Sequence, residues 1–180
     1  MKKIFAVLSP IVVTSFLVQA TLAQAPATAC GTDSRNYTFQ TDSDISIPSP
    51  AQGMATLVLI EDQLEDRPDH AACVKCASQL TLGMDGQWIA ATHGFSHTAI
   101  SIPAGDHHFC VSNSPPIVAP DALPAMLGLH VEAGKTYFVR GRLARLEGFA
   151  VLDLTQINED EGRYLVSMSK RSLFTKQATP

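Results

Sequence analysis

The amino-acid sequence predicts a mainly β fold, an antiparallel β-sandwich of about seven to nine short strands with one short helix near its C-terminus. Three features of the sequence support this expectation. Apolar and polar residues alternate in many short runs, glycine-containing turns separate those runs, and a single late stretch carries the signals of a helix. A small closed barrel is the main alternative arrangement of the same strands.

The first two strands are expected at residues 35–41 and 54–62. Tyr37 and Phe39 are two positions apart and share one face, which suits an edge strand. The later run, MATLVLIED, is almost continuously apolar and contains β-branched residues, as in a central strand covered on both faces. The Ser- and Pro-rich segment that ends at Gly53 is typical of a connector.

A β-hairpin is expected where Asp85 and Gly86 separate the alternating residues 78–84 from a second apolar run that includes Trp88. Asp-Gly between two such runs is a strong hairpin signal, because the tight turn needs positive φ angles that aspartate tolerates and glycine adopts readily. This pair is therefore predicted to be a structural turn.

A further turn, containing Pro103 and Gly105, follows a short strand at residues 98–102 and precedes another strand. Because successive residues of a strand point to opposite faces, the histidines of this strand are expected to separate. One face would carry His107, Phe109 and Val111, and the other would carry His108 and Cys110.

The second half of the chain continues the same pattern. Residues 114–124 contain four prolines and are expected to form a loop or an extended crossover. Alternation resumes at residues 127–131, Gly134 marks another structural turn, and strands are expected at residues 136–146 and 149–157.

One short helix is expected after Asn158. Glu161 lies three residues later and completes a capping box, while the acidic first turn suits the helix dipole. Leu165 and Met168 are expected to hold this helix against the sheet. The tail, residues 170–180, is expected to be loosely ordered.

The N-terminus resembles a secretory signal peptide. Lys2 and Lys3 precede the uncharged, largely apolar residues 4–18, a run too short to span a bilayer. We take Ala25 as the nominal end of the signal, with Ala23 and Ala29 as the other candidate cleavage sites. The protein is therefore expected to be exported, either to a periplasm or to the medium.

The expected domain organisation has four parts. They are a signal peptide at residues 1–25, an N-terminal strand and linker at 26–53, the β-sandwich domain at 54–169 and a flexible tail at 170–180. Loss of the signal peptide would remove two lysines and no acidic residue, which would move the formal net charge from −4 to −6. This mildly acidic balance argues against a nucleic-acid partner or an anionic lipid surface.

Four cysteines in an exported chain are expected to form disulfides. They are Cys30, Cys73, Cys76 and Cys110. Three pairings are possible, and we favour Cys76 with Cys110 and Cys30 with Cys73, on the assumption that Cys76 precedes one strand and Cys110 lies on another. Alternatively, Cys30 follows a degenerate lipoprotein signal and would be lipidated, which is the one route by which a membrane would become a partner.

Three short motifs resemble a family of bacterial exported proteins catalogued as domain of unknown function 2846. They are DGQW at residues 85–88, PAGDHHFC at 103–110 and AGKTYFVR at 133–140, and the likeness extends over most of residues 54–165. Ala104 between Pro103 and Gly105 departs from the Pro-Gly-x-His turn of related modules. The resemblance implies a PEGA-like, transthyretin-like or immunoglobulin-like sandwich and an envelope location, and it implies no activity.

Two kinds of chemistry can be proposed for the cysteines and histidines. Cys73 and Cys76 could form a redox dithiol, or could bind zinc together with His107 and His108. Adjacent strand residues point apart, however, which opposes zinc binding by the two histidines together. A second metal site would use His93, His97 and His108. We expect His107 instead to be neutral, buried behind the turn and bonded to a backbone carbonyl.

No nucleophile elbow, HExxH helix or obvious carboxylate pair is present in the sequence. A candidate recognition surface consists of Trp88, Arg140 and Arg142, the two arginines belonging to a basic ribbon with Lys135 and Arg145. The simpler interpretation is that Trp88 covers the sheet and that the basic residues protect an edge strand from aggregation.

The sequence therefore favours an exported, non-catalytic β-sandwich module with no cofactor, which acts in binding or in envelope structure. Its expected partner is an envelope protein or a glycan. The alternative is an exported redox or metal-binding protein that uses Cys73 and Cys76 with nearby histidines.

Overall fold

The computed structural model describes residue 30 and residues 37–62, 79–113, 124–146 and 149–177, of which residues 143–146 and 149–151 are described by backbone alone. The described residues form ten strands and one helix. These are β1 (Tyr37–Asp42), β2 (Met54–Glu61), β3 (Gln79–Met84), β4 (Gln87–His93), β5 (Ser96–Pro103), β6 (Gly105–Asn113), β7 (Ala125–Val131), β8 (Thr136–Leu146), β9 (Phe149–Ile157), α1 (Glu159–Met168) and β10 (Lys170–Lys176).

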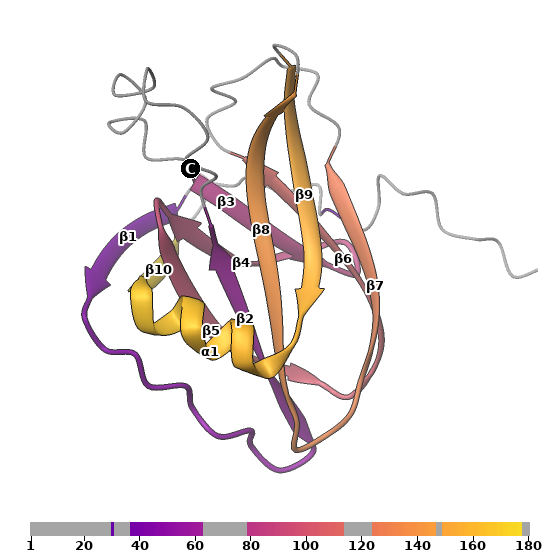
Figure 1. Ribbon diagram of the computed structural model, residues 1–180. Coiled ribbons are helices and arrows are strands. Elements are labelled where there is room, and N and C mark those ends of the chain that lie inside the picture. The colour runs from indigo at the N-terminus through magenta and orange to yellow at the C-terminus, as the bar shows by residue number, and fades with distance from the viewer. Residues whose placement is uncertain (1–29, 31–36, 63–78, 114–123, 147–148, 178–180) are drawn as a thin grey trace, which may run out of the picture.

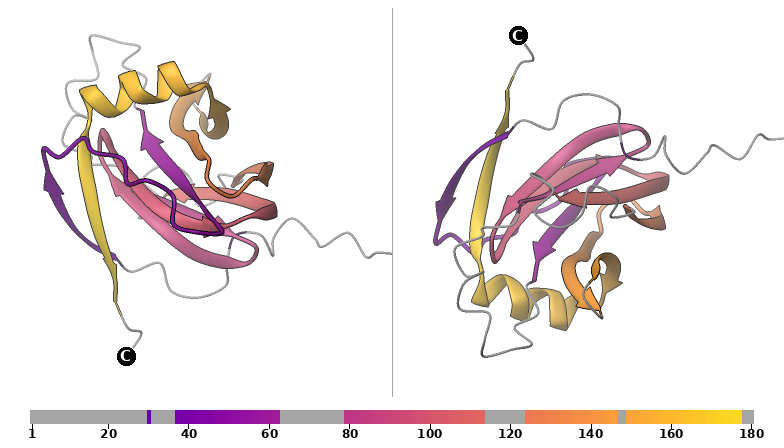
Figure 2. Two further views of the ribbon diagram at one scale, coloured as in Figure 1. Left: turned by 90° about the horizontal axis from the view of Figure 1, so that it is seen from below. Right: turned by 90° about the horizontal axis from the view of Figure 1, so that it is seen from above.

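The strands form two facing sheets, and the predicted β-sandwich is confirmed. One sheet has the order β1-β10-β5-β2-β8-β9 and the other has the order β4-β3-β6-β7. Figure 1 shows α1 lying across the six-stranded sheet, and Figure 2 shows that the smaller sheet lies on the opposite side. The sandwich is not wholly antiparallel, because β2 pairs with β8 in parallel and β10 pairs with β5 in parallel.

Strand β2 is central, as its apolar sequence predicts. Leu57 and Leu59 face the smaller sheet, whereas Val58 and Ile60 belong to a second apolar cluster beneath α1. All four residues are completely buried. A strand covered on both faces needs apolar residues at consecutive positions, which explains why β2 lacks polar alternation.

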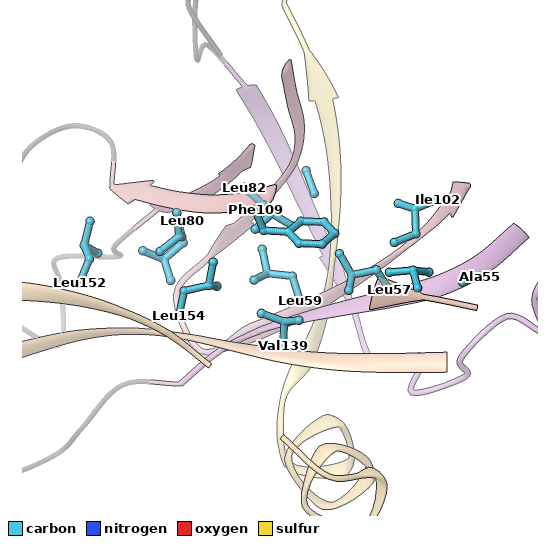
Figure 3. Packing of buried hydrophobic residues seen from close by; sticks show 13 residues of the cluster. Ala55, Leu57, Leu59, Leu80, Leu82, Ile102, Phe109, Val139, Leu152 and Leu154 are labelled. Atoms are coloured by element: carbon cyan, nitrogen blue, oxygen red, sulfur yellow. The ribbon is translucent and has the colours of Figure 1, made fainter. Parts of the chain in front are cut away.

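The main core lies between the two sheets. Figure 3 shows its side chains meeting from both layers, with Phe109 of β6 beside residues of β2, β3 and β5. Burial of such side chains is the main favourable contribution to folding. The buried members are Ala55, Leu57, Leu59, Leu80, Leu82, Ala90, Ile102, Phe109, Val111, Val131, Val139, Leu152 and Leu154.

The predicted β3–β4 hairpin is observed, with an irregularity that the sequence did not indicate. Asp85 has a φ of 49° and Gly86 a φ of 88°, as a tight primed turn requires. Leu82 pairs with Ala90 but Gly83 pairs with Trp88, so Ile89 is an extra residue in a β-bulge. The bulge lets Ala90 enter the core while the ring of Trp88 packs on the outer face.

Helix α1 begins as predicted, because the Asn158 side chain accepts a hydrogen bond of 2.9 Å from the backbone N–H of Glu161. Leu165 packs against the cluster beneath the helix, as predicted, together with the buried Val166. Met168 was also expected to hold the helix, but it is 60% exposed. The helix approaches closely because Gly162 has no side chain where it faces Phe138.

The C-terminal residues correct the expected flexible tail, because Lys170–Lys176 form strand β10. Strand β10 lies between β1 and β5 in the larger sheet, and β1 is an edge strand as predicted. Both ends of the described chain therefore belong to the sandwich itself, not to a linker and a tail outside it. We call β1, α1 and β10 together the lateral unit.

Candidate functional site

The structure joins Cys30 to Cys110 in a disulfide with Cα atoms 5.3 Å apart. This pairing contradicts the favoured bonds of Cys76 with Cys110 and of Cys30 with Cys73. Cys110 points outward from β6, as its parity predicts, and there it meets the segment that precedes β1. Cys73 and Cys76 themselves lie outside the described residues.

The same disulfide bears on two other predictions. A Cys30 sulfur bonded to Cys110 has no valence left for a thioether-linked lipid, so the structure favours the disulfide over lipidation. Trp88 packs with both cysteines and with Tyr37 and is only 8% exposed. The ring therefore covers the sheet, which was the simpler of its two interpretations.

A polar cluster gathers where several turns meet at one end of the sandwich. We call it the turn end. The β5–β6 turn and the β7–β8 turn lie together there, because Gly105 pairs with Val131. The β3–β4 turn lies beside them, because the backbone N–H of Asp85 donates to the carbonyl of His108 over 3.0 Å. The backbone N–H of Gly134, whose φ is 80°, donates to the carbonyl of Met54 over 2.8 Å.

Asp85 and His107 connect the first two of these turns. The Asp85 carboxylate contacts His107 Nδ1 through Oδ2 at 2.6 Å and accepts the backbone N–H of His108 through Oδ1 at 2.9 Å. His107 Nε2 lies 3.0 Å from the carbonyl oxygen of Pro103. One imidazole ring therefore ties the hairpin turn to the next turn along the chain.

Both ring nitrogens of His107 face acceptors. A carbonyl oxygen can only accept, so Nε2 donates to Pro103, which is the backbone bond that the sequence predicts. The contact of Nδ1 with the Asp85 carboxylate is a second partner that the sequence did not indicate.

Asp85 is held in its ionised form. Burial by itself raises the pKa of this carboxyl, but the hydrogen bonds from His107 and from the His108 backbone outweigh that effect, and the resulting pKa lies below its usual range. Both nitrogens of His107 are engaged, so neither is free to act as a general base.

Two exposed ion pairs border this cluster. His130 Nδ1 lies 2.7 Å from Asp106 Oδ1 across β6 and β7, and Lys135 Nζ donates to Glu132 Oε1 over 2.7 Å. The backbone N–H of Glu132 also donates to the hydroxyl of Tyr137 over 2.9 Å. The turn end thus presents charged side chains on turns whose backbones are fixed from within.

The histidines of the predicted metal site are dispersed. His93, at the end of β4, stacks on Phe39 with ring centroids 5.3 Å apart, whereas His108 is exposed on β6. His97 is completely buried on β5. Nowhere in the described part of the chain do three His, Cys, Asp or Glu side chains gather to hold a metal ion.

The predicted basic ribbon is not a free surface. Arg140 pairs with Glu161 of α1, and Arg142 Nε donates to Asp62 Oδ2 over 2.9 Å. Strand β8 lies between β2 and β9, so these arginines do not protect a sheet edge as expected. Lys135 belongs to the turn end, and the side chain of Arg145 lies outside the described residues.

A Ser–His pair that the sequence did not reveal lies between β5 and the end of α1. His97 Nδ1 is 2.8 Å from Ser169 Oγ, although 72 residues separate them in the chain. Both are buried, at 0% and 7% exposure, so a substrate cannot reach them. No local sequence signal marks such a pair, because the topology alone brings the two residues together.

Within the described ranges, no helix has the length and apolar character needed to cross a membrane.

The sequence matches no protein-family model and no curated protein.

Proposed function

We propose that the protein is an exported, non-catalytic β-sandwich module that binds an envelope partner through its turn end. The observation that carries this proposal is the Asp85–His107 bridge, which fixes two turns at once by bonds of 2.6 Å and 3.0 Å. Binding loops are most effective when a rigid scaffold holds them before the partner arrives.

The environments of His107 and of the His97–Ser169 pair also support binding rather than catalysis. His107 uses both nitrogens in internal bonds, and the Ser169 hydroxyl beside His97 is buried. A catalytic nucleophile and base must contact both each other and a bound substrate. Within the described residues these pairs serve to connect elements.

The side chains at the turn end indicate a polar partner. Asp106 and His130 are 84% and 67% exposed, and Glu132 and Lys135 are each more than half exposed. Such groups recognise hydroxyl, amide or charged groups by hydrogen bonding, as on a glycan or on the polar rim of a protein interface. The resemblance to domain of unknown function 2846 supports the same envelope location.

The test is capture from a detergent extract of the cell envelope by the purified mature protein, followed by identification of the bound species. The double variant Asp106→Asn with His130→Gln removes the outer pair of the turn end. The matched control, Glu159→Gln with Arg163→Gln, removes another exposed pair, on α1. We expect one species to bind the wild type and the control and to be lost from the turn-end variant. Equal capture by all three proteins, or none by any, would overturn the proposal.

The redox alternative gains one observation from the structure. The sequence has four cysteines, and Cys110 is bonded to Cys30. Within the chain, Cys73 and Cys76 can therefore form a disulfide only with each other. A Cys-x-x-Cys pair of this kind suits dithiol–disulfide exchange. Thiol titration and mass mapping test it: a bond between these two cysteines that mild reductant opens selectively would favour the redox function, and resistance would exclude it.

A further inference from the structure

His97 occupies the junction between the sandwich and the lateral unit. It lies on β5 opposite Ile60 of β2 on one side and opposite Arg171 of β10 on the other. Its side chain reaches Ser169, which ends helix α1, and it is completely buried. Three elements that meet from distant parts of the chain therefore enclose one imidazole ring.

The hydrogen bonds identify the tautomer of His97. The Ser169 hydroxyl donates its single hydrogen to the carbonyl of Val166 over 3.2 Å, so it can only accept from His97 Nδ1. Nδ1 therefore carries the proton and Nε2 is bare. Among the described residues Nε2 has no hydrogen-bond partner, so a proton added there would meet no acceptor.

The charged groups that face His97 come from β10 and from the segment around β1. They are Arg171, Asp42 and Asp44; the neighbour from β2 is Ile60, and the neighbour at the end of α1 is the neutral Ser169. Arg171 bonds Asp42 through Nε at 3.1 Å and Nη2 at 2.7 Å, and it contacts Asp44 at 2.5 Å. The arginine thus already occupies the carboxylates that could compensate an imidazolium.

The balance of these effects favours the neutral ring. Burial is the largest cause that lowers the pKa of His97, Arg171 lowers it further, and the two aspartates oppose this only in part. Hydrogen bonding to Arg171 lowers the pKa of Asp42, and bonding to the Ser46 backbone lowers that of Asp44. Both aspartates therefore remain ionised at pH values where a histidine titrates.

The strand pairing beside His97 is short. Strand β10 pairs with β5 at only two positions, Lys170 with Ser96 and Arg171 with His97, whereas it pairs with β1 at six. Beside the ladder, the Ser96 and Ser172 hydroxyls lie 2.9 Å apart. A disturbance at His97 therefore affects the junction directly and leaves the pairing within the lateral unit intact.

We propose that His97 is an acid-sensitive latch: protonation of its ring loosens α1 and β10 from β5 while the remainder of the sandwich stays folded. Opening lets water reach the ring, so the open state binds a proton more readily than the closed state. Opening is therefore least favourable above the ordinary histidine pKa of 6.5 and becomes more favourable as the pH falls below it. One proton per molecule gives at most about a tenfold increase in the opening equilibrium for each pH unit.

The test is hydrogen exchange measured by mass spectrometry on the oxidised protein, at a series of pH values from about 7.5 to about 5, with correction for intrinsic exchange rates. Peptides from α1 and β10 are expected to lose protection below about pH 6.5, by up to about tenfold per pH unit, while β2 and β8 keep theirs. Unchanged protection of α1 and β10 in the wild type would overturn the proposal without any variant.

Two variants assign the effect to one ring. His97→Gln provides a side-chain amide that does not titrate, and it should abolish the pH dependence of exchange in α1 and β10. His108→Gln, on the exposed face of β6, should leave that dependence intact. The same dependence in His97→Gln as in the wild type would contradict the assignment. The latch does not rest on the binding function proposed above, because exchange is measured without a partner.

Discussion

His107 and His97 are both buried histidines of this sandwich, at 8% and 0% exposure, yet their surroundings differ completely. His107 has a hydrogen-bond partner for each nitrogen, one of them the Asp85 carboxylate. His97 has a partner for Nδ1 alone, and its bare nitrogen faces no acceptor among the described residues.

The comparison shows that burial alone does not define what a histidine does. At His107 a carboxylate and a carbonyl face the two ring nitrogens, so the ring holds two turns together. At His97, a proton added to Nε2 would find no hydrogen-bond acceptor among the described residues. One ring therefore connects two turns through both of its nitrogens, and the other would leave an added proton without an acceptor.

The largest expected effect comes from removing the disulfide that joins Cys30, which precedes β1 in the chain, to the strand of His107. Cys30 and Cys110 are 80 residues apart, and loss of a bond that closes such a loop costs about 2–5 kcal/mol. The double variant Cys30→Ser with Cys110→Ser should lower the free energy of unfolding in urea by that amount. Unchanged stability would contradict a stabilising Cys30–Cys110 bond.

A smaller effect is expected from Gly162→Ala, which tests the lateral unit without changing charge. A Cβ at this position would lie 2.7 Å from Cβ of Phe138 and closer still to its ring, so α1 would have to move away from the sheet. We expect a loss of about 1–3 kcal/mol in the free energy of unfolding.

The matched control is Gly128→Ala on β7, where an added Cβ meets no atom within 4 Å. It should leave stability within about 0.5 kcal/mol of the wild type. Equal losses in the two variants would mean that α1 does not pack on Phe138 in solution.

The Asp85–His107 bridge is expected to contribute less than the helix contact. Asp85→Asn keeps the positive φ of the turn accessible but removes the carboxylate charge, and it should lower the free energy of unfolding by about 1 kcal/mol at neutral pH. Asp106→Asn, which affects the exposed pair with His130, should change it by less than about 0.5 kcal/mol. Equal losses of stability in Asp85→Asn and Asp106→Asn would show that the contact with the buried His107 contributes no more than the contact with the exposed His130.

The smallest effect is a second acid-induced loss of stability, distinct from that of His97. The pKa of Asp85 is lowered in the folded protein, so its contribution is present above the ordinary value of 3.8 and disappears as the pH falls through the lower folded value. Unfolding measured from pH 5 to pH 2 should show a shallower dependence in Asp85→Asn than in the wild type. An identical pH dependence in the two proteins would show that Asp85 does not contribute to the loss of stability in this pH range.

Much of the fold could be predicted because its signals are local. The Asp85–Gly86 hairpin, the Asn158 cap and the alternation that separates His107 from Cys110 each depend on residues a few positions apart. Turn and cap chemistry needs no knowledge of the rest of the chain. The predictions of these local features were correct, and so was the prediction of a β-sandwich.

The errors concern contacts between distant residues. The Cys30–Cys110 bond, the parallel pairing of β10 with β5 and the His97–Ser169 contact join segments more than 70 residues apart. Sequence patterns contain no information on which strand becomes the neighbour of another, and so the tail was expected to be loose. The latch residue was missed as such for the same reason, although His97 itself was named as a metal ligand.

The difference between the two histidines is tested most directly by a long-range ¹H–¹⁵N correlation spectrum of the imidazole rings of the folded protein near pH 7. His97 should show a protonated Nδ1 and a bare Nε2, whereas His107 should show a proton on the Nε2 that donates to Pro103. A proton on Nε2 of His97, or a bare Nε2 in His107, would contradict the roles assigned to the two rings.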